Sequence, residues 1–214
     1  MAGTRLALFD LDGTLIDSEI GILASAEYAL AKLGAVAPAR DVLRTWIGPP
    51  LRATFPTVLG DDPDIIERAV TLYRERFSDV GWREHTVYPG IAPIIEAIAE
   101  RGIQLAVVTS KPDLYAGRIV DSLVFGRRFA RVYAVHAGSA HSEKAQMIAE
   151  AIADFGVAPE HAAMIGDRHF DIAGARANGV HAIGAAWGFG SIKELNEAGA
   201  HVIAHTPGDL AGLL

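Results

Sequence analysis

The sequence predicts an α/β fold in which helices cover both faces of a parallel sheet and a small helical domain is inserted near the N-terminus. Two observations predict the sheet: short apolar runs recur along the chain, and amphipathic helical patterns separate most of them. Continuous apolar runs are typical of parallel strands that are buried on both faces. A third observation predicts the insertion, because no convincing strand pattern occurs between about residues 18 and 85.

The apolar runs give the order of the expected strands. They are Arg5–Phe9, Gln104–Thr109, Arg131–His136, Ala162–Ile165, His181–Ala186 and His201–His205. Two intervening helices have clear end signals. The helix Pro89–Arg101 is followed by Gly102, and the helix Ser142–Phe155 begins at a candidate N-cap and is followed by Gly156.

The inserted region contains two clear helical patterns. One covers Ser18–Leu33, and the other begins at Asp62, a candidate N-cap, followed by Pro63 at the first helical position. The segment Val87–Gly90 is the expected return to the sheet. We therefore expect a core domain formed by residues 1–16 and 87–214 and a helical domain formed by residues 17–86.

Composition narrows the possible partners and location. The 214-residue chain has a net charge of −7, which argues against a nucleic-acid polymer or an anionic membrane as its main partner. It contains no Cys, so disulfides and thiolate metal ligands are excluded. The first apolar run stops at Asp10, and no run is long enough to span a bilayer. We expect a cytoplasmic protein, as a monomer or a homodimer, that acts on a small molecule.

Four groups of polar and charged residues lie just after expected strands or at the beginning of the helix that follows. These groups are Asp10-Leu11-Asp12-Gly13-Thr14, Thr109-Ser110-Lys111, Lys144, and Gly166-Asp167-Arg168-His169-Phe170-Asp171. In a parallel sheet the carboxyl ends of the strands meet at one edge, so all four groups are expected there.

The acids at this edge predict a metal site. Asp10, Asp12, Asp167 and Asp171 would repel one another unless some were protonated or a cation lay between them. Oxygen ligands of this kind suit Mg²⁺, which leaves coordination positions open for water and phosphate. With Lys144, such a metal could neutralise a phosphoryl group, as phosphoryl transfer requires.

The spacing of the first two acids suggests how they divide the chemistry. In an extended segment, Asp10 and Asp12 point to the same side. One carboxylate could attack phosphorus, and the other could protonate the leaving group and later deprotonate water. Gly13 allows a sharp turn where the phosphate would lie.

Together these segments resemble the four motifs of the haloacid dehalogenase superfamily. The matching segments are FDLDGTLIDS, VVTSK, Lys144 and IGDRHFD. The segments WIGPPL, YPGI and WGFGSIKEL further resemble the phosphoglycolate phosphatase and bacterial 5′-nucleotidase-like group. The resemblance implies a Rossmann-like core with a helical cap of the C1 type. It also implies a Mg²⁺-dependent phosphatase that acts through an aspartyl-phosphate on a small phosphorylated metabolite.

The same resemblance implies a role for each matching residue. Asp10 is the expected nucleophile, Asp12 the general acid/base, Thr109 a phosphoryl ligand and Lys144 the neutralising cation. Asp167, the Asp10 carboxylate and the Asp12 backbone carbonyl are the expected Mg²⁺ ligands, with Asp171 in the outer shell. Substrate contacts are expected from Gly13, Thr14 and Ser110 in the core and from Gly48 and Arg52 in the cap. Lys111 is a rival for the lysine role, but it is expected to point away because it follows Thr109 so closely.

Other functions remain open at this point. A phosphomutase related to β-phosphoglucomutase would use the same motifs. A 2-haloacid dehalogenase is disfavoured, since it needs no second acid at the position of Asp12. A receiver-like signalling domain is disfavoured by the helical insertion. A non-enzymatic phosphate-binding protein of this fold would be expected to lose at least one of the acids, and all are present.

Overall fold

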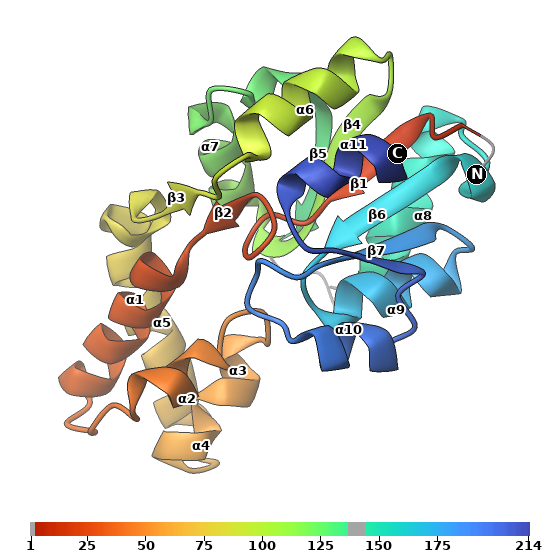
Figure 1. The fold of residues 1–214 in the computed structure, drawn as a ribbon. Helices are drawn as coiled ribbons and strands as arrows, with labels where there is room; N and C mark the ends of the chain where they lie inside the picture. The colour runs from red at the N-terminus through yellow and green to blue at the C-terminus, as the bar shows by residue number, and fades with distance from the viewer. Residues whose placement is uncertain (1–2, 137–143) are drawn as a thin grey trace. The chain divides into compact units, whose positions relative to one another are not determined.

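The computed structural model describes residues 3–136 and 144–214, and the chain divides into two compact units. Met1–Ile16 and Val87–Leu214 form the first, called here the core unit, and Asp17–Thr86 form the second, called the cap unit. Figure 1 shows the ribbon with its element labels.

The core unit is built on a parallel sheet with the strand order β5-β4-β1-β6-β7-β8. Its strands are β1 (Leu6–Phe9), β4 (Gln104–Pro112), β5 (Phe129–Val135), β6 (Ala162–Gly166), β7 (His181–Ala185) and β8 (Val202–Ala204). Strand β1 lies at the centre, where Leu6 is paired with Gln104 on one side and with Ala162 on the other. The prediction of a parallel α/β sheet is confirmed.

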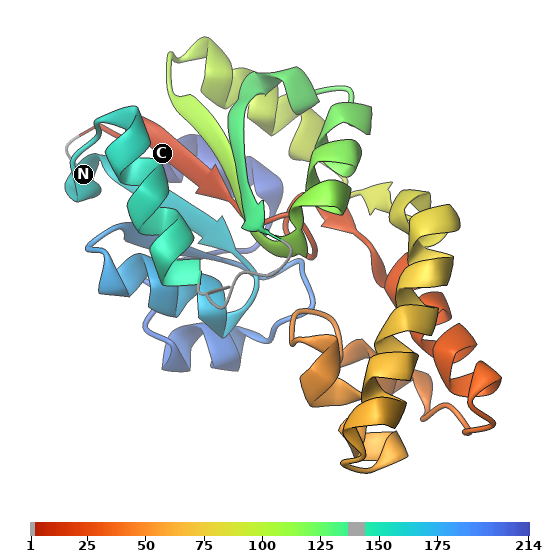
Figure 2. The ribbon, with the colours of Figure 1, turned by 180° about the vertical axis from the view of Figure 1, so that it is seen from behind.

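Helices cover both faces of this sheet, as the two opposite views show (Figures 1 and 2). Helices α8 (Lys144–Phe155) and α9 (His169–Ala177) lie on one face. Their buried side chains, including Ile148 and Ile172, form one cluster with Leu6 and Leu8 of β1. Helices α6 (Ile91–Glu100) and α11 (Leu210–Leu213) lie on the other face, and α7 (Asp113–Ser122) packs on β4 and β5.

The largest difference from an expected boundary is at the end of β4. Strand β4 does not end at Thr109 but continues to Pro112, with an irregular register between Val108 and Pro112. The expected helix Ser142–Phe155 is described from Lys144 onward, and its first two residues lie outside the described ranges. Short elements complete the core unit: α10 (Ile192–Glu197), η2 (Gly126–Arg128), η3 (Pro159–His161) and η4 (Pro207–Asp209).

The cap unit is helical. Its elements are α1 (Glu19–Lys32), α2 (Arg40–Arg44), α3 (Leu51–Thr54), α4 (Pro56–Leu59), α5 (Pro63–Asp79) and η1 (Gly81–Arg83). Asp62 caps α5 as predicted, since its carboxylate accepts hydrogen bonds from the amides of Asp64 and Ile65. The short strands β2 (Ile16–Asp17) and β3 (Thr86–Val87) pair with each other at the two crossings between the units. Within the described ranges, no helix is both long and apolar enough to cross a membrane.

Candidate active site

The first candidate acid stands where the central strand ends. All four residues of β1 are buried, and the amide of Asp10 still donates to the Ile165 carbonyl of β6 at 2.9 Å. The chain then turns back, because the Leu11 carbonyl accepts from the amides of Leu15 and Ile16. Gly13 has a φ of 84°, a left-handed conformation that glycine adopts without strain. This turn leaves the Asp10 carboxylate at the carboxyl edge of the sheet, with 8% of the residue exposed.

Asp167 follows the neighbouring strand β6 and is held from two sides. Its Oδ1 accepts a hydrogen bond from the Thr14 hydroxyl at 3.2 Å, and its Oδ2 accepts one from the Phe189 amide at 2.8 Å. The residue is fully buried. These two donors fix the direction in which the carboxylate points.

Asp171 lies in the first turn of α9 and has two contacts. Its Oδ2 accepts from the amide of Arg168, the N-cap residue, at 3.1 Å. This is the helix-capping role that an acid often takes at the third helical position. Its Oδ1 lies 2.8 Å from Lys144 Nζ, although the geometry is not that of a good hydrogen bond. The helix-cap interpretation and the active-site interpretation of Asp171 are therefore compatible.

Lys144, the first described residue of α8, joins the two acids. Its Nζ lies 2.8 Å from Asp10 Oδ1 and from Asp171 Oδ1, and it donates to the Val108 carbonyl at 2.9 Å. Burial alone lowers the pKa of this ammonium group, but the two carboxylates outweigh it and raise the pKa above its ordinary value. The surroundings of Lys144 therefore favour its charged form.

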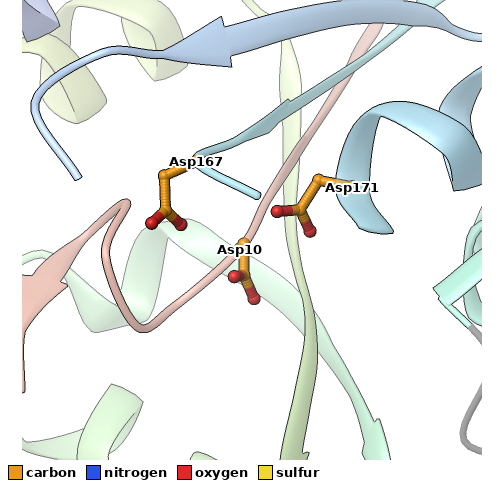
Figure 3. A group of neighbouring side chains, drawn as sticks. All are labelled: Asp10, Asp167 and Asp171. Atoms are coloured by element: carbon orange, nitrogen blue, oxygen red, sulfur yellow. The ribbon is translucent and has the colours of Figure 1, made fainter. Parts of the chain in front are cut away.

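The carboxylates of Asp10, Asp167 and Asp171 lie close together (Figure 3). Asp10 directly follows β1, Asp167 directly follows β6, and Asp171 belongs to α9. One carboxylate oxygen of each lies within 4.8 Å of the others. Burial, reinforced by Asp171 and opposed by Lys144, raises the pKa of Asp10 to about 6. Burial together with Asp10 and Asp171 raises the pKa of Asp167 well above its ordinary value. For both groups, burial and the neighbouring carboxylates outweigh the contacts that favour the charged form.

Glycines make the close approach of these acids possible. A Cβ on Gly166 would lie 2.2 Å from the Asp171 carboxyl carbon, and one on Gly13 would lie 2.2 Å from Asp167 Oδ2. A Cβ on Gly188 would lie 2.3 Å from both the Asp167 Cβ and the Gly13 carbonyl oxygen. Each of these contacts is far shorter than side chains tolerate, so the positions require the absence of a side chain.

The acid cluster fits a hard divalent cation. Three carboxylates against one ammonium group leave a formal charge of −2 in a buried space. Carboxylate oxygens are preferred ligands of Mg²⁺. A divalent cation would remove the repulsion that raises the pKa values of these acids. The side chains that could hold it are Asp10, Asp167 and Asp171, whereas the expected contribution of the Asp12 backbone carbonyl stays a prediction.

The structure gives Asp12 a different partner. Lys111 Nζ donates to both Asp12 oxygens, at 2.9 and 2.7 Å. The expectation that Lys111 points away from the site is wrong, because its side chain is only 5% exposed and is directed at Asp12. The irregular end of β4 accompanies this orientation, since the Lys111 amide donates back to the Thr109 hydroxyl at 3.2 Å. The site therefore contains two lysines, each paired with a different acid of the first motif.

The remaining expected contacts of the core unit differ in exposure. Thr109 is buried at the end of the regular part of β4, whereas Ser110 is exposed. The hydroxyl of Thr14 is directed at Asp167, so its side chain supports an acid. Gly13 lies in the same turn as Thr14, and a Cβ on Gly13 would clash with the Asp167 carboxylate. Substrate contacts by Gly13, Thr14 and Ser110 stay predictions.

The two expected substrate residues of the cap unit are on its surface. Gly48 is exposed and has a φ of 106°. Arg52 is exposed on α3, and its guanidinium group binds Glu67 of α5 through two hydrogen bonds at 2.5 and 2.8 Å. Their contact with a substrate stays a prediction.

Sequence reasoning missed the support that the segment after β7 gives to the site. The Trp187 indole donates to the Thr14 carbonyl at 3.0 Å, and the neighbouring Phe189 amide binds Asp167. Glu194 of α10 accepts from the Arg168 side chain and from the amide of His169, between the two acids of the fourth motif. Only the resemblance of WGFGSIKEL to a known group singled out this segment in the sequence.

This chain is similar to known proteins in both sequence and fold. Residues 7–185 match the model of the family described as haloacid dehalogenase-like hydrolase. A 5′-nucleotidase from Pseudomonas aeruginosa is 42% identical over 96% of this chain and 92% of its own length. A protein named tyrosine-protein kinase PtkA, from Mycobacterium tuberculosis, is 33% identical over 94% of this chain and 68% of its own length. A haloacid dehalogenase-like family hydrolase from Streptococcus pneumoniae superposes with a TM-score of 0.92 at 32% identity, covering 100% of this chain and 99% of that one.

Proposed function

The chain belongs to the haloacid dehalogenase-like hydrolase family, and on that premise we propose that it is a Mg²⁺-dependent phosphatase of small phosphorylated metabolites. The proposed reaction passes through an aspartyl-phosphate on Asp10. The observation that carries the proposal is the buried cluster of three acids and Lys144 at the end of β1. Its formal charge of −2 matches a divalent cation, and its position matches the edge of the sheet where such enzymes bind substrates.

In the first half of the proposed reaction, an Asp10 oxygen attacks the phosphorus atom of the ester. The bond between phosphorus and the leaving-group oxygen breaks, and Asp12 donates a proton to that oxygen. Lys144 holds Asp10 in place and offsets its charge, so that the carboxylate can approach an anionic substrate. When bound, Mg²⁺ supplies the positive charge that neutralises the phosphoryl oxygens.

In the second half, water attacks the phosphorus atom of the aspartyl-phosphate. Asp12 accepts a proton from this water, the bond between Asp10 and phosphorus breaks, and inorganic phosphate is released. Asp10 returns to the carboxylate form and Asp12 to the protonated form in which each began, so the cycle balances. Thr109, buried beside the site, is proposed to donate its hydroxyl hydrogen to a phosphoryl oxygen, because that hydroxyl already accepts from the Lys111 amide.

Hydrolysis of p-nitrophenyl phosphate with and without Mg²⁺ tests the proposal. Wild-type protein is expected to release p-nitrophenolate with Mg²⁺ and to stop after thorough chelation. Asp10→Asn is expected to abolish turnover. Asp12→Asn is expected to accumulate a phosphorylated protein, detectable by intact-protein mass and released by hydroxylamine, because p-nitrophenolate leaves without a proton. Turnover that survives chelation would contradict the proposal.

A substrate panel addresses specificity. The 5′-nucleotidase named among the relatives supports nucleoside 5′-monophosphates as the first compounds to compare with phosphoglycolate and hexose phosphates. Ranking kcat/KM across the panel identifies the preferred class. A phosphomutase would convert one hexose phosphate isomer into another without releasing stoichiometric phosphate, and the same assay detects that outcome.

One relative is named as a tyrosine-protein kinase, so a tyrosine hydroxyl is a second phosphate acceptor to test. A protein kinase would transfer phosphate from ATP to a tyrosine hydroxyl, whereas the proposed phosphatase transfers it to water. Incubation with labelled ATP and Mg²⁺, followed by phosphoamino-acid analysis, separates the two outcomes. Label that is stable to hydroxylamine and found on tyrosine would favour the kinase.

A further inference from the structure

We propose that Lys111 is the positioning residue for Asp12, with a role separate from that of Lys144. This inference rests on the proposed function, in which Asp12 transfers protons to the leaving group and from water. The carrying observation is the two-armed contact from Lys111 Nζ to both Asp12 oxygens, at 2.9 and 2.7 Å.

The two lysines have different partners. Lys144 Nζ has three oxygen neighbours within 2.9 Å, from Asp10, Asp171 and the Val108 carbonyl. An ammonium group has three donors, so Lys144 is committed to the nucleophile side of the site. Lys111 is the cation that contacts Asp12, and the side chains of this pair are only 5% and 16% exposed. A partly buried ion pair is screened less by dissolved salt than a surface pair is, so the attraction between Lys111 and Asp12 persists at physiological ionic strength.

The backbone favours this placement of Lys111. Residues two positions apart in an extended segment point to the same side, so Thr109 and Lys111 both turn toward the site. The register of β4 shifts between Val108 and Pro112, and the Lys111 amide bonds back to the Thr109 hydroxyl within this irregular segment. The irregular strand end thus delivers a hydroxyl and an ammonium group to the same edge.

A fixed Asp12 matters most in the half-reactions that move a proton. Proton transfer requires the carboxylate to lie within hydrogen-bond reach of the leaving-group oxygen or of the attacking water. Loss of orientation of about 1 Å can reduce a rate by about a hundredfold. Attack of Asp10 on p-nitrophenyl phosphate needs no such transfer, so its rate is expected to be independent of Lys111.

The test compares two rates in the Lys111→Met variant with Mg²⁺. Steady-state kcat is expected to fall by about tenfold to a hundredfold. Because only breakdown of the aspartyl-phosphate is slowed, KM should fall with it and kcat/KM should change little. The pre-steady-state burst of p-nitrophenolate is expected to stay close to that of wild type. Lys111→Arg should recover part of the turnover, because a guanidinium group also binds both oxygens of a carboxylate. Lys193→Met, on the exposed surface of α10, controls for the loss of one positive charge.

Each other result decides against the inference. A slower burst with a raised KM would show that Lys111 binds the phosphoryl group instead of positioning Asp12. Unchanged turnover would show that the contact has no role in catalysis. If circular dichroism shows that Lys111→Met does not fold, the same two rates are measured in Lys111→Arg and in the double variant Asp12→Asn, Lys111→Arg. If Lys111 acts by positioning Asp12, the lysine substitution should have no further effect in protein that already carries Asp12→Asn. Absence of wild-type phosphatase activity would instead contradict the proposed function.

Discussion

The core unit and the cap unit differ in how deeply their charged side chains are buried. Among the described residues, the buried charged ones are Asp10, Lys111, Lys144, Asp167 and Asp171, and all belong to the core unit. In the cap unit, the Arg52 and Glu67 side chains of one ion pair are 55% and 56% exposed. Surface pairs contribute little to stability, whereas buried charges are costly unless they are compensated. The buried charges of the core unit are therefore grouped at the proposed active site, and four substitutions or conditions test whether they serve catalysis there.

The largest effect is expected from Lys144→Met. This change leaves the buried Asp10 and Asp171 carboxylates without their shared cation. Breaking a buried pair costs about 3–5 kcal/mol of the free energy of unfolding, and losing a charge-stabilising donor costs about 10²–10³-fold in kcat. Urea unfolding and steady-state kinetics measure the two effects. Lys193→Met is the matched control, and an equal loss in both variants would contradict the special role of the buried lysine.

The next effect is expected from Gly188→Ala. The new Cβ would meet the Asp167 Cβ and the Gly13 carbonyl oxygen at 2.3 Å, so the backbone or the acid must move. We expect a loss of about 1–3 kcal/mol in the free energy of unfolding and weaker Mg²⁺ binding by calorimetry. Gly117→Ala in α7 is the control, because nothing lies within 4 Å of its Cβ and the helix should gain up to about 1 kcal/mol. Similar outcomes for both glycines would refute the steric explanation.

A smaller effect is expected from pH in the metal-free protein. The pKa of Asp10 is raised from 3.8 to about 6 by burial and Asp171, against Lys144. The folded protein therefore binds more protons than the unfolded chain between about pH 4 and pH 6, so its stability falls as pH rises through this range. Added Mg²⁺ should raise the unfolding temperature more above this range than below it. Thermal unfolding in chelator and in Mg²⁺ measures the difference, and stability that rises with pH in chelator alone would disprove the expected sign.

The smallest effect on stability is expected from Arg52→Ala in the cap unit. Its partner Glu67 is exposed, so the unfolding temperature should stay within measurement error of wild type. If Arg52 binds the substrate anion as the sequence predicts, KM should rise while kcat changes less. Arg68→Ala, an arginine substitution on the neighbouring helix α5, is the control for general loss of cap charge. A large drop in unfolding temperature would contradict the contrast between the two units.

Much of the fold could be predicted from local patterns. The runs LALF and AAMI are apolar throughout, which is typical of central parallel strands, and Asp62-Pro63 carries a complete helix-start signal. The end of β4 was harder to predict, because Ser110 and Lys111 are polar and Pro112 has no amide hydrogen for a ladder. Hydrophobicity marks where a strand is buried, and a polar strand end lies outside that signal.

The positions of the acids of the site could also be predicted from their spacing in the sequence. The contacts that hold these acids in place could not. The rule that places Asp10 and Asp12 on one side applies equally to Thr109 and Lys111, and applying it there would have directed Lys111 into the site. The Phe189 amide carries no such signal, since every residue except proline has one. Its role depends on how the segment after β7 packs against Asp167, which only the folded chain defines.

The two contacts of Asp171 couple the first turn of α9 to the acid cluster. One of its oxygens receives the amide that begins α9, and the other faces Lys144. Opening of the first turn of α9 would therefore release one acid from the cluster. Slow hydrogen exchange at the Arg168 amide would then indicate that the acid cluster is intact, even in protein without substrate.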